Sequence, residues 1–150
     1  MKNKDILDLK NSQSVVTHLT FIQGIINRMA GNSSNCKILV ATILTIVITV
    51  LLGFNNYNNY WWITIIIIVY GLISDAYYLT YERNFREEYN DFVHKINRRK
   101  LKIKDIYIIK NIKGICYCEF PIKMIKSMTS FSVWTYYITL GVVCYIIKII

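Results

Sequence analysis

The sequence predicts an all-α membrane protein with three transmembrane helices, an N-terminal amphipathic helix and a basic cytoplasmic segment. Three apolar stretches predict the spans, because residues 38–54, 60–74 and 128–147 contain no charged residue. A helix needs about 20 residues to cross a hydrocarbon core of about 30 Å. The third stretch has that length, and the first two reach it by borrowing a few flanking residues. Lipid offers no water to the backbone, so each span is expected to be helical.

The positions of the basic residues predict the orientation of the spans. Lysine and arginine concentrate in residues 1–37 and 81–128, and the FNNYNN turn at 54–59 has none. The positive-inside rule therefore predicts a cytoplasmic N-terminus, an outside turn and an outside C-terminus. The expected segments are a cytoplasmic N-terminal helix (1–35), a transmembrane hairpin (36–80), a basic cytoplasmic segment (81–127) and a third span (128–150).

Residues 12–30 are expected to form a separate helix in front of the first span. Its apolar residues recur every three or four positions and form one narrow stripe: Val15, Leu19, Ile22, Ile26 and Met29. Gly31 and Asn32 are stop signals, so the helix is expected to end there. The stripe fits a helix lying flat on the membrane surface or one packing against copies of itself. His18 is expected to pack at a helix interface.

The first span carries three threonines on one face, Thr42, Thr45 and Thr49. Such threonines bond to their own backbone or to a neighbouring helix, or they line a water-filled pore. No charged residue is expected at the midplane of any span, which argues against a proton pump or an ion-coupled transporter. Asp75 is expected near the cytoplasmic boundary of the second span.

The second span is expected to continue as a helix to about Lys95, with Glu82 and Arg86 paired at i, i+4. Six basic residues and no acid follow in KINRRKLKIK, 95–104. This patch suits lipid headgroups or the phosphates of a nucleic acid or nucleotide. Residues 105–120 fit a short β-hairpin, and a helix nearly as well.

The sequence contains no recognisable catalytic or cofactor-binding motif. It lacks a glycine-rich phosphate loop, H-E-x-x-H and G-x-S-x-G, and it has two histidines. The four cysteines suit neither a zinc site nor a disulfide framework, so we expect them to be reduced. We therefore expect a protein that is not an enzyme and that has no metal or cofactor.

Three stretches resemble small bacterial membrane proteins from anti-phage defence loci: FIQGIINRMAGNS (21–33), SDAYYLTYERNFREEYN (74–90) and SMTSFSVWTYY (127–137). The nearest such family is the membrane effector of Hailong systems. The resemblance implies a homo-oligomeric, tetrameric ion channel of the bacterial inner membrane. It also implies a single-stranded oligodeoxyadenylate ligand, made by a neighbouring nucleotidyltransferase, which holds the channel shut and whose loss depolarises the cell.

The resemblance also suggests roles for particular residues. The expected ligand-binding basic residues are Lys2, Lys4, Lys10, Arg28, Lys95, Arg98, Arg99, Lys100, Lys102 and Lys104. The expected plug or gate residues are Leu19, Phe21, Ile22, Ile25, Ile26 and Met29. Thr42, Thr45 and Thr49 would then line the pore. Inter-subunit pairs at the cytoplasmic mouth would involve Asp75, Glu82, Arg83 and Arg86. The alternatives are a channel opened by a cyclic nucleotide and a membrane-anchored adaptor that conducts nothing.

Overall fold

The computed structural model describes residues 13–54, 56–102, 105–106, 108 and 119–149. Its helices are α2 (Gln13–Gly53), α3 (Tyr57–Tyr60), α4 (Trp62–Asn97), α6 (Glu119–Met128) and α7 (Phe131–Ile149). The residues described contain no strand, so the predicted all-α class is confirmed. The alternative β-hairpin at 105–120 lies almost wholly outside the described residues.

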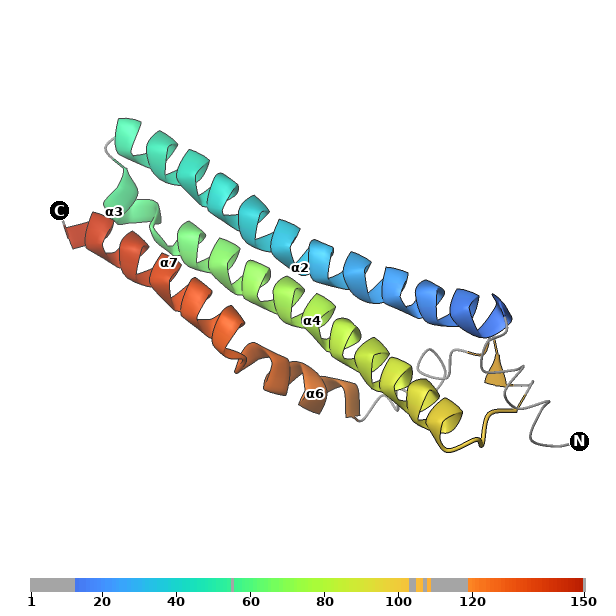
Figure 1. Ribbon diagram of the computed structural model, residues 1–150. Coiled ribbons are helices and arrows are strands. Elements are labelled where there is room, and N and C mark those ends of the chain that lie inside the picture. Colours follow the sequence, from blue (N-terminus) through green and yellow to red (C-terminus); the bar gives the residue numbers. More distant parts are fainter. Residues whose placement is uncertain (1–12, 55, 103–104, 107, 109–118, 150) are drawn as a thin grey trace, which may run out of the picture.

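Three helices, α2, α4 and α7, are each long and apolar enough to cross a membrane. They lie side by side, with α4 between α2 and α7 in Figure 1. At 1.5 Å per residue, the 41 residues of α2 measure about 60 Å and the 36 residues of α4 about 54 Å. Both helices therefore extend well beyond a hydrocarbon core of about 30 Å.

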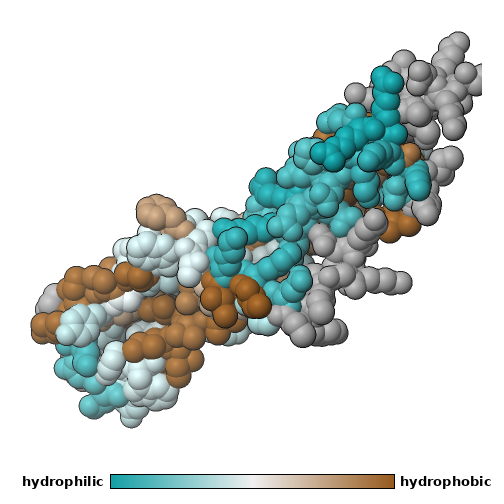
Figure 2. All heavy atoms as spheres, turned by 90° about the horizontal axis from the view of Figure 1, so that it is seen from below, coloured by the Kyte–Doolittle hydropathy of each residue, from teal (hydrophilic) through white to brown (hydrophobic). Residues whose placement is uncertain are grey.

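The molecule consequently has two parts. We call the paired extensions of α2 (13–35) and α4 (81–97) the stalk. The membrane half comprises α2 from 36, α4 up to 80, and α7. Figure 2 shows hydrophobic residues gathered over one half of the molecule and hydrophilic residues over the other. This division agrees with three membrane-spanning helices, two of which continue into water.

The predicted break between an N-terminal helix and the first span is wrong. Helix α2 runs without interruption through Gly31 and Asn32. A glycine inside a helix costs about 1 kcal/mol relative to alanine. The buried face of α2 continues across this point through Ile26, Ser33 and Val40. Packing along α4 therefore outweighs the local stop signal, and the expected separate helix is the first part of a long one.

The core of the membrane half is built from α2, α4 and α7. Its buried residues are Val40, Leu44, Val133, Tyr137 and Cys144. Gly71 on α4 allows the helices to approach closely. A Cβ atom there would overlap the side chain of Val40 and lie 3.0 Å from Tyr137 Cε1. A small residue at this helix contact is typical of packing in membranes.

The stalk has a separate apolar core. Ile22, Ile25 and Ile26 of α2 are buried against Phe85 of α4. Towards the end of the stalk, His18 is 1% exposed and its ring centroid lies 4.4 Å from that of Phe92. The predicted packed histidine is confirmed. The expected continuation of the second helix is also confirmed, because α4 ends at Asn97.

Helix α6 packs along α4 below the third span. Thr80 and Ser127 are both buried, with their hydroxyl oxygens 2.9 Å apart. Lys123 Nζ donates to Asn84 Oδ1 at 3.1 Å and lies 3.4 Å from Glu87 Oε2. These contacts attach the start of α7 to the side of α4 that faces away from α2, as Figure 1 shows.

Candidate functional site

A polar cluster centred on the buried Asp75 joins the three long helices where the stalk meets the membrane half. Asp75 of α4 is fully buried, and its Oδ1 accepts a hydrogen bond from Ser33 Oγ. Lys37 Nζ lies 3.4 Å from Asp75 Oδ2 and donates to Ser132 Oγ at 3.3 Å. The hydroxyl of Tyr136 donates to the backbone oxygen of Lys37 at 2.7 Å. We call these five residues the junction cluster.

The junction cluster explains why Asp75 is stable in an apolar setting. A buried carboxylate without a partner is costly, since the penalty after relaxation is several kcal/mol per ion. Lys37 supplies the opposite charge and Ser33 a hydrogen bond, both from α2. Because Lys37 also contacts two residues of α7, the charge pair fixes the relative positions of three helices. The partners Ser33 and Lys37, which are four residues apart on one helix face, were not predicted from the sequence.

The residues expected at the cytoplasmic mouth lie in different surroundings. Asp75 is paired within its own chain, with Ser33. Arg83 is also paired within the chain, because its Nη2 donates to Ser130 Oγ at 2.9 Å. Glu82 and Arg86 form the predicted i, i+4 pair, with Arg86 Nε 2.8 Å from Glu82 Oε1. Contacts of these residues with a second subunit remain a prediction.

A row of small and polar residues follows the outer face of α2, roughly opposite its contact with α4. We call it the outer face, and its small and polar exposed members are Thr17, Thr20, Gly24, Arg28, Gly31, Asn35, Thr42, Thr45 and Thr49. Ile38 and Ile46 are also exposed on this side of α2. Every threonine in this row donates to the backbone oxygen four residues earlier, at 2.8 to 2.9 Å. The three threonines expected in a pore therefore satisfy their donors within α2 and keep their oxygens on the surface.

The residues expected to form a plug lie mainly in the stalk core. Ile22, Ile25 and Ile26 are buried by α4, and Met29 packs against them. Leu19 is half-buried, whereas Phe21 is 55% exposed. A plug role stays a prediction, and in this arrangement it falls to the whole α2–α4 stalk rather than to a separate helix.

The expected basic patch is only partly within the described residues. Lys2, Lys4, Lys10 and Lys104 lie outside them. Arg98, Arg99, Lys100 and Lys102 are exposed at or beyond the end of α4, where Arg99 has a φ of 55°.

Two further basic residues lie apart from this group. Lys95 Nζ lies 3.9 Å from Asp105 Oδ1 and shares a pocket with three more acids, Glu87, Glu88 and Asp91. Arg28 lies about 22 Å along α2 from Gln13, far from the stalk tip. The ten basic residues therefore do not form one continuous surface among those described.

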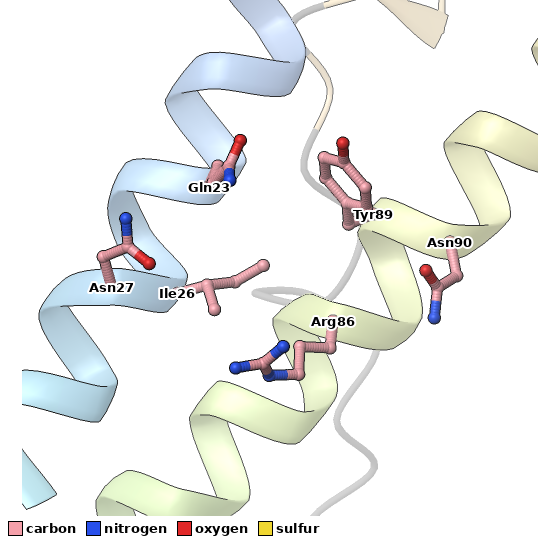
Figure 3. A pocket seen from close by; sticks show the side chains of 6 residues that line it. All are labelled: Gln23, Ile26, Asn27, Arg86, Tyr89 and Asn90. Carbon is pink, nitrogen blue, oxygen red and sulfur yellow. The ribbon is translucent and has the colours of Figure 1, made fainter.

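A polar pocket of about 240 Å³ opens between the two stalk helices, and we call it the stalk pocket. Figure 3 shows the side chains that line it, which are Gln23, Ile26, Asn27, Arg86, Tyr89 and Asn90. Three carboxamides, a guanidinium and a phenol ring offer donors, acceptors and an aromatic surface. Sequence reasoning missed this site, although Gln23 with Asn27 and Arg86 with Asn90 are both spaced i, i+4.

Comparison of the chain with protein-family models, with curated proteins and with solved structures found no match. Within the described part of the chain, no three His, Cys, Asp or Glu side chains are grouped so that they could hold a metal ion. The junction cluster, the outer face of α2 and the stalk pocket are three polar features of the described residues that could carry a function.

Proposed function

We propose that the chain is one subunit of a homo-oligomeric ion channel in the bacterial inner membrane, with the outer face of α2 lining the pore. The observation that supports this proposal most is the composition of that face. Between Gly31 and Thr49 it exposes Asn35 and three threonines on a helix apolar enough to span a membrane. The hydroxyl protons of these threonines are already bonded within α2, so what remains at the surface are hydroxyl oxygens and the Asn35 amide, which water in a pore would solvate and lipid would not.

The opposite surface of the membrane half supports the same assignment. Helix α7 exposes large apolar side chains such as Val142, Val143 and Ile146. These suit contact with lipid tails. Large apolar side chains such as Ile38 and Ile46 are exposed on α2 as well. The proposal therefore directs only the threonine-bearing side of α2 towards the axis of a symmetric ring and places α7 outermost. Four subunits is the number that the resemblance to defence channels implies.

We propose further that the channel is an anti-phage defence effector controlled from the cytoplasmic side. The surplus of lysine and arginine at the stalk end favours a cytoplasmic stalk under the positive-inside rule. The ligand would be a single-stranded oligodeoxyadenylate made by a neighbouring nucleotidyltransferase. Bound ligand would keep the pore shut, and its loss on infection would depolarise the cell. Because the stalk and the pore-lining segment belong to one helix, a ligand on the stalk can act directly on the pore.

Cysteine accessibility in planar bilayers tests the pore assignment. Thr45→Cys should conduct without ligand and lose most of its current when a cationic methanethiosulfonate reagent is added. Val143→Cys on α7 is the matched control in the same membrane half and should keep its current, as should the unsubstituted chain with its native cysteines. Equal loss in both variants would remove α2 from the pore.

Absence of current in all ligand conditions would overturn the channel proposal and favour the non-conducting adaptor. Current that appears only when a cyclic nucleotide is added would show that a ligand opens the channel and does not close it. Each result is read from the same preparation of full-length chain, whose insertion is checked by its retention in the lipid fraction.

A further inference from the structure

The stalk pocket places polar side chains from two facing helices around one space. Gln23 and Asn27 come from successive turns of α2, and Arg86 and Asn90 from successive turns of α4. In Figure 3, Ile26 and the guanidinium of Arg86 both point across the gap towards the opposite helix. A single ligand in this space would therefore touch both stalk helices.

The pocket has one charged lining residue, Arg86, which is ion-paired through its Nε with Glu82 and offers its remaining donors to a ligand. None of its six lining residues is acidic. Glu82 accepts a hydrogen bond from Arg86 Nε, so the two Nη atoms, which point towards α2 in Figure 3, are the donors that face the pocket. A guanidinium presents paired donors that match the oxygens of a phosphate.

A second stalk pocket shows the opposite chemistry. It measures about 290 Å³ and is lined by Lys95, Phe92, Ile108 and four acids. The acids are Glu87, Glu88, Asp91 and Asp105. Phosphates would be repelled there. The acidic pocket is therefore incompatible with a nucleic acid. A further stalk pocket beside Arg28 also lacks acids, but α2 alone lines it, so of these three only the stalk pocket beside Arg86 combines an acid-free lining with contacts to both helices.

The remaining side chains suit a nucleobase. A carboxamide has a donor and an acceptor side by side, and it pairs bidentately with the N6 and N7 atoms of adenine. Tyr89 supplies an aromatic ring of the kind on which bases stack. A pocket of about 240 Å³ is smaller than the roughly 300 to 1,000 Å³ typical of pockets for drug-sized ligands, so it suits one base rather than several.

We infer that the stalk pocket binds one base of a single-stranded polynucleotide together with the adjoining phosphate. The amides of Gln23, Asn27 and Asn90 read the base, and Arg86 binds the phosphate. The inference rests on the proposed function for the polynucleotide nature of the ligand. It adds the position of the site and the source of its base preference, since phosphate contacts position a nucleic acid and base contacts specify it.

The same geometry gives a mechanism of control. A base held between α2 and α4 favours the arrangement in which both helices contact it. Helix α2 continues from the pocket through the junction cluster to the proposed pore. Occupation of the stalk pocket would therefore restrain the pore-lining helix without any ligand atom entering the membrane.

Binding of two labelled hexanucleotides to the full-length chain in detergent tests this inference by fluorescence anisotropy. The probes are hexameric oligodeoxyadenylate and hexameric oligodeoxythymidylate at one fixed salt concentration. The unsubstituted chain should prefer the adenylate. Asn27→Ala should reduce that preference by roughly fivefold to a hundredfold, the range expected for losing one bidentate base contact.

Two control variants separate base reading from charge and from folding. Gln13→Ala removes an exposed amide at the start of α2 that does not line the pocket and should leave the preference unchanged. Arg98→Gln removes a charge at the stalk tip and should weaken both probes equally. Asn27 is itself exposed, so its variant should keep the elution volume and helical content of the parent.

The outcomes distinguish this inference from the proposed function. An unchanged base preference in Asn27→Ala, or equal binding of both probes by the parent chain, would overturn the assignment of the pocket even if the protein conducts. A preference lost only in Asn27→Ala would support the pocket even if planar bilayers show no current. In that case the channel proposal alone would fail.

Discussion

The stalk and the membrane half are built from the same two helices but are stabilised differently. In the stalk, large side chains such as Ile22 and Phe85 fill the contact, together with the buried polar residues His18 and Asn84. In the membrane half, Gly71 lets the helices approach closely, α7 is added as a third helix, and a buried ion pair lies at the boundary. Water drives burial in the first region, whereas lipid is as apolar as the side chains in the second.

The junction cluster lies where these two kinds of helix packing meet, so it influences how the stalk is aligned with the membrane half. The stalk core tolerates some sliding because apolar contacts are non-directional. An ion pair with hydrogen bonds to three helices is directional. We therefore expect the alignment of the two halves to depend on Asp75 and Lys37 more than on any single apolar contact.

Asp75→Ala is expected to have the largest effect. It leaves Lys37 without its counter-ion at a site where its side chain is only 21% exposed. Breaking a buried ion pair costs about 3–5 kcal/mol, and the partial exposure of Lys37 places the expected loss near the lower end. The free energy of unfolding, measured by denaturant titration in detergent micelles, should fall by that amount.

Two comparisons make this prediction specific. Lys37→Met in the Asp75→Ala background should restore much of the lost stability, because no unpaired charge then remains. Glu87→Ala breaks the exposed pair with Lys123 in the stalk and should change stability by less than about 1 kcal/mol. Equal losses for Asp75→Ala and Glu87→Ala would show that the junction cluster behaves like an ordinary surface pair.

The sequence was sufficient to predict the elements that depend on long-range hydropathy. The three charge-free stretches identified the spans, and the pair Glu82–Arg86 marked the continuation of α4. These signals are local in the chain or averaged over many residues. They survive folding because lipid imposes helical structure on any segment long enough to cross it.

Pairings between distant residues could not be predicted in the same way. Gly31-Asn32 signalled a helix end locally, and only the contact of Ile26, Ser33 and Val40 with other helices explains why α2 continues. The sequence places Asp75 near the boundary of the second span, but its partners Ser33 and Lys37, and Ser132 beyond them, are common residue types with no distinguishing pattern. The stalk pocket depends on the alignment of two helices, which periodicity alone does not determine.

Gly71→Ala should have an intermediate effect and tests the close approach in the membrane half. The added Cβ would overlap Val40, and overpacking of this kind costs about 1–3 kcal/mol. Gly141→Ala in α7 is the matched control, since its Cβ would meet nothing within 4 Å. The same denaturant titration should show a loss only for Gly71→Ala, and equal behaviour would show that the helices do not need a small residue at this contact.

The smallest expected effect is a pH dependence confined to the stalk. Burial lowers the pKa of His18 below its ordinary value of 6.5, although the charge of Glu88 partly opposes this. The unfolded chain therefore binds a proton on this residue at a higher pH than the folded chain does. The corresponding stability is complete above about pH 6.5 and is lost as the pH falls towards the lower folded value.

A Phe substitution at this position separates the pH effect from the loss of packing. His18→Phe keeps an aromatic ring against Phe92 and removes the titrating group. The parent should lose stability between pH 7 and pH 5, by less than about 1.4 kcal/mol for each unit that separates the two pKa values. The difference in unfolding free energy between parent and His18→Phe should therefore shift over this range. A difference that does not vary with pH would mean that His18 is protonated equally in the folded and unfolded chains, and that its burial in the stalk has no influence on its protonation.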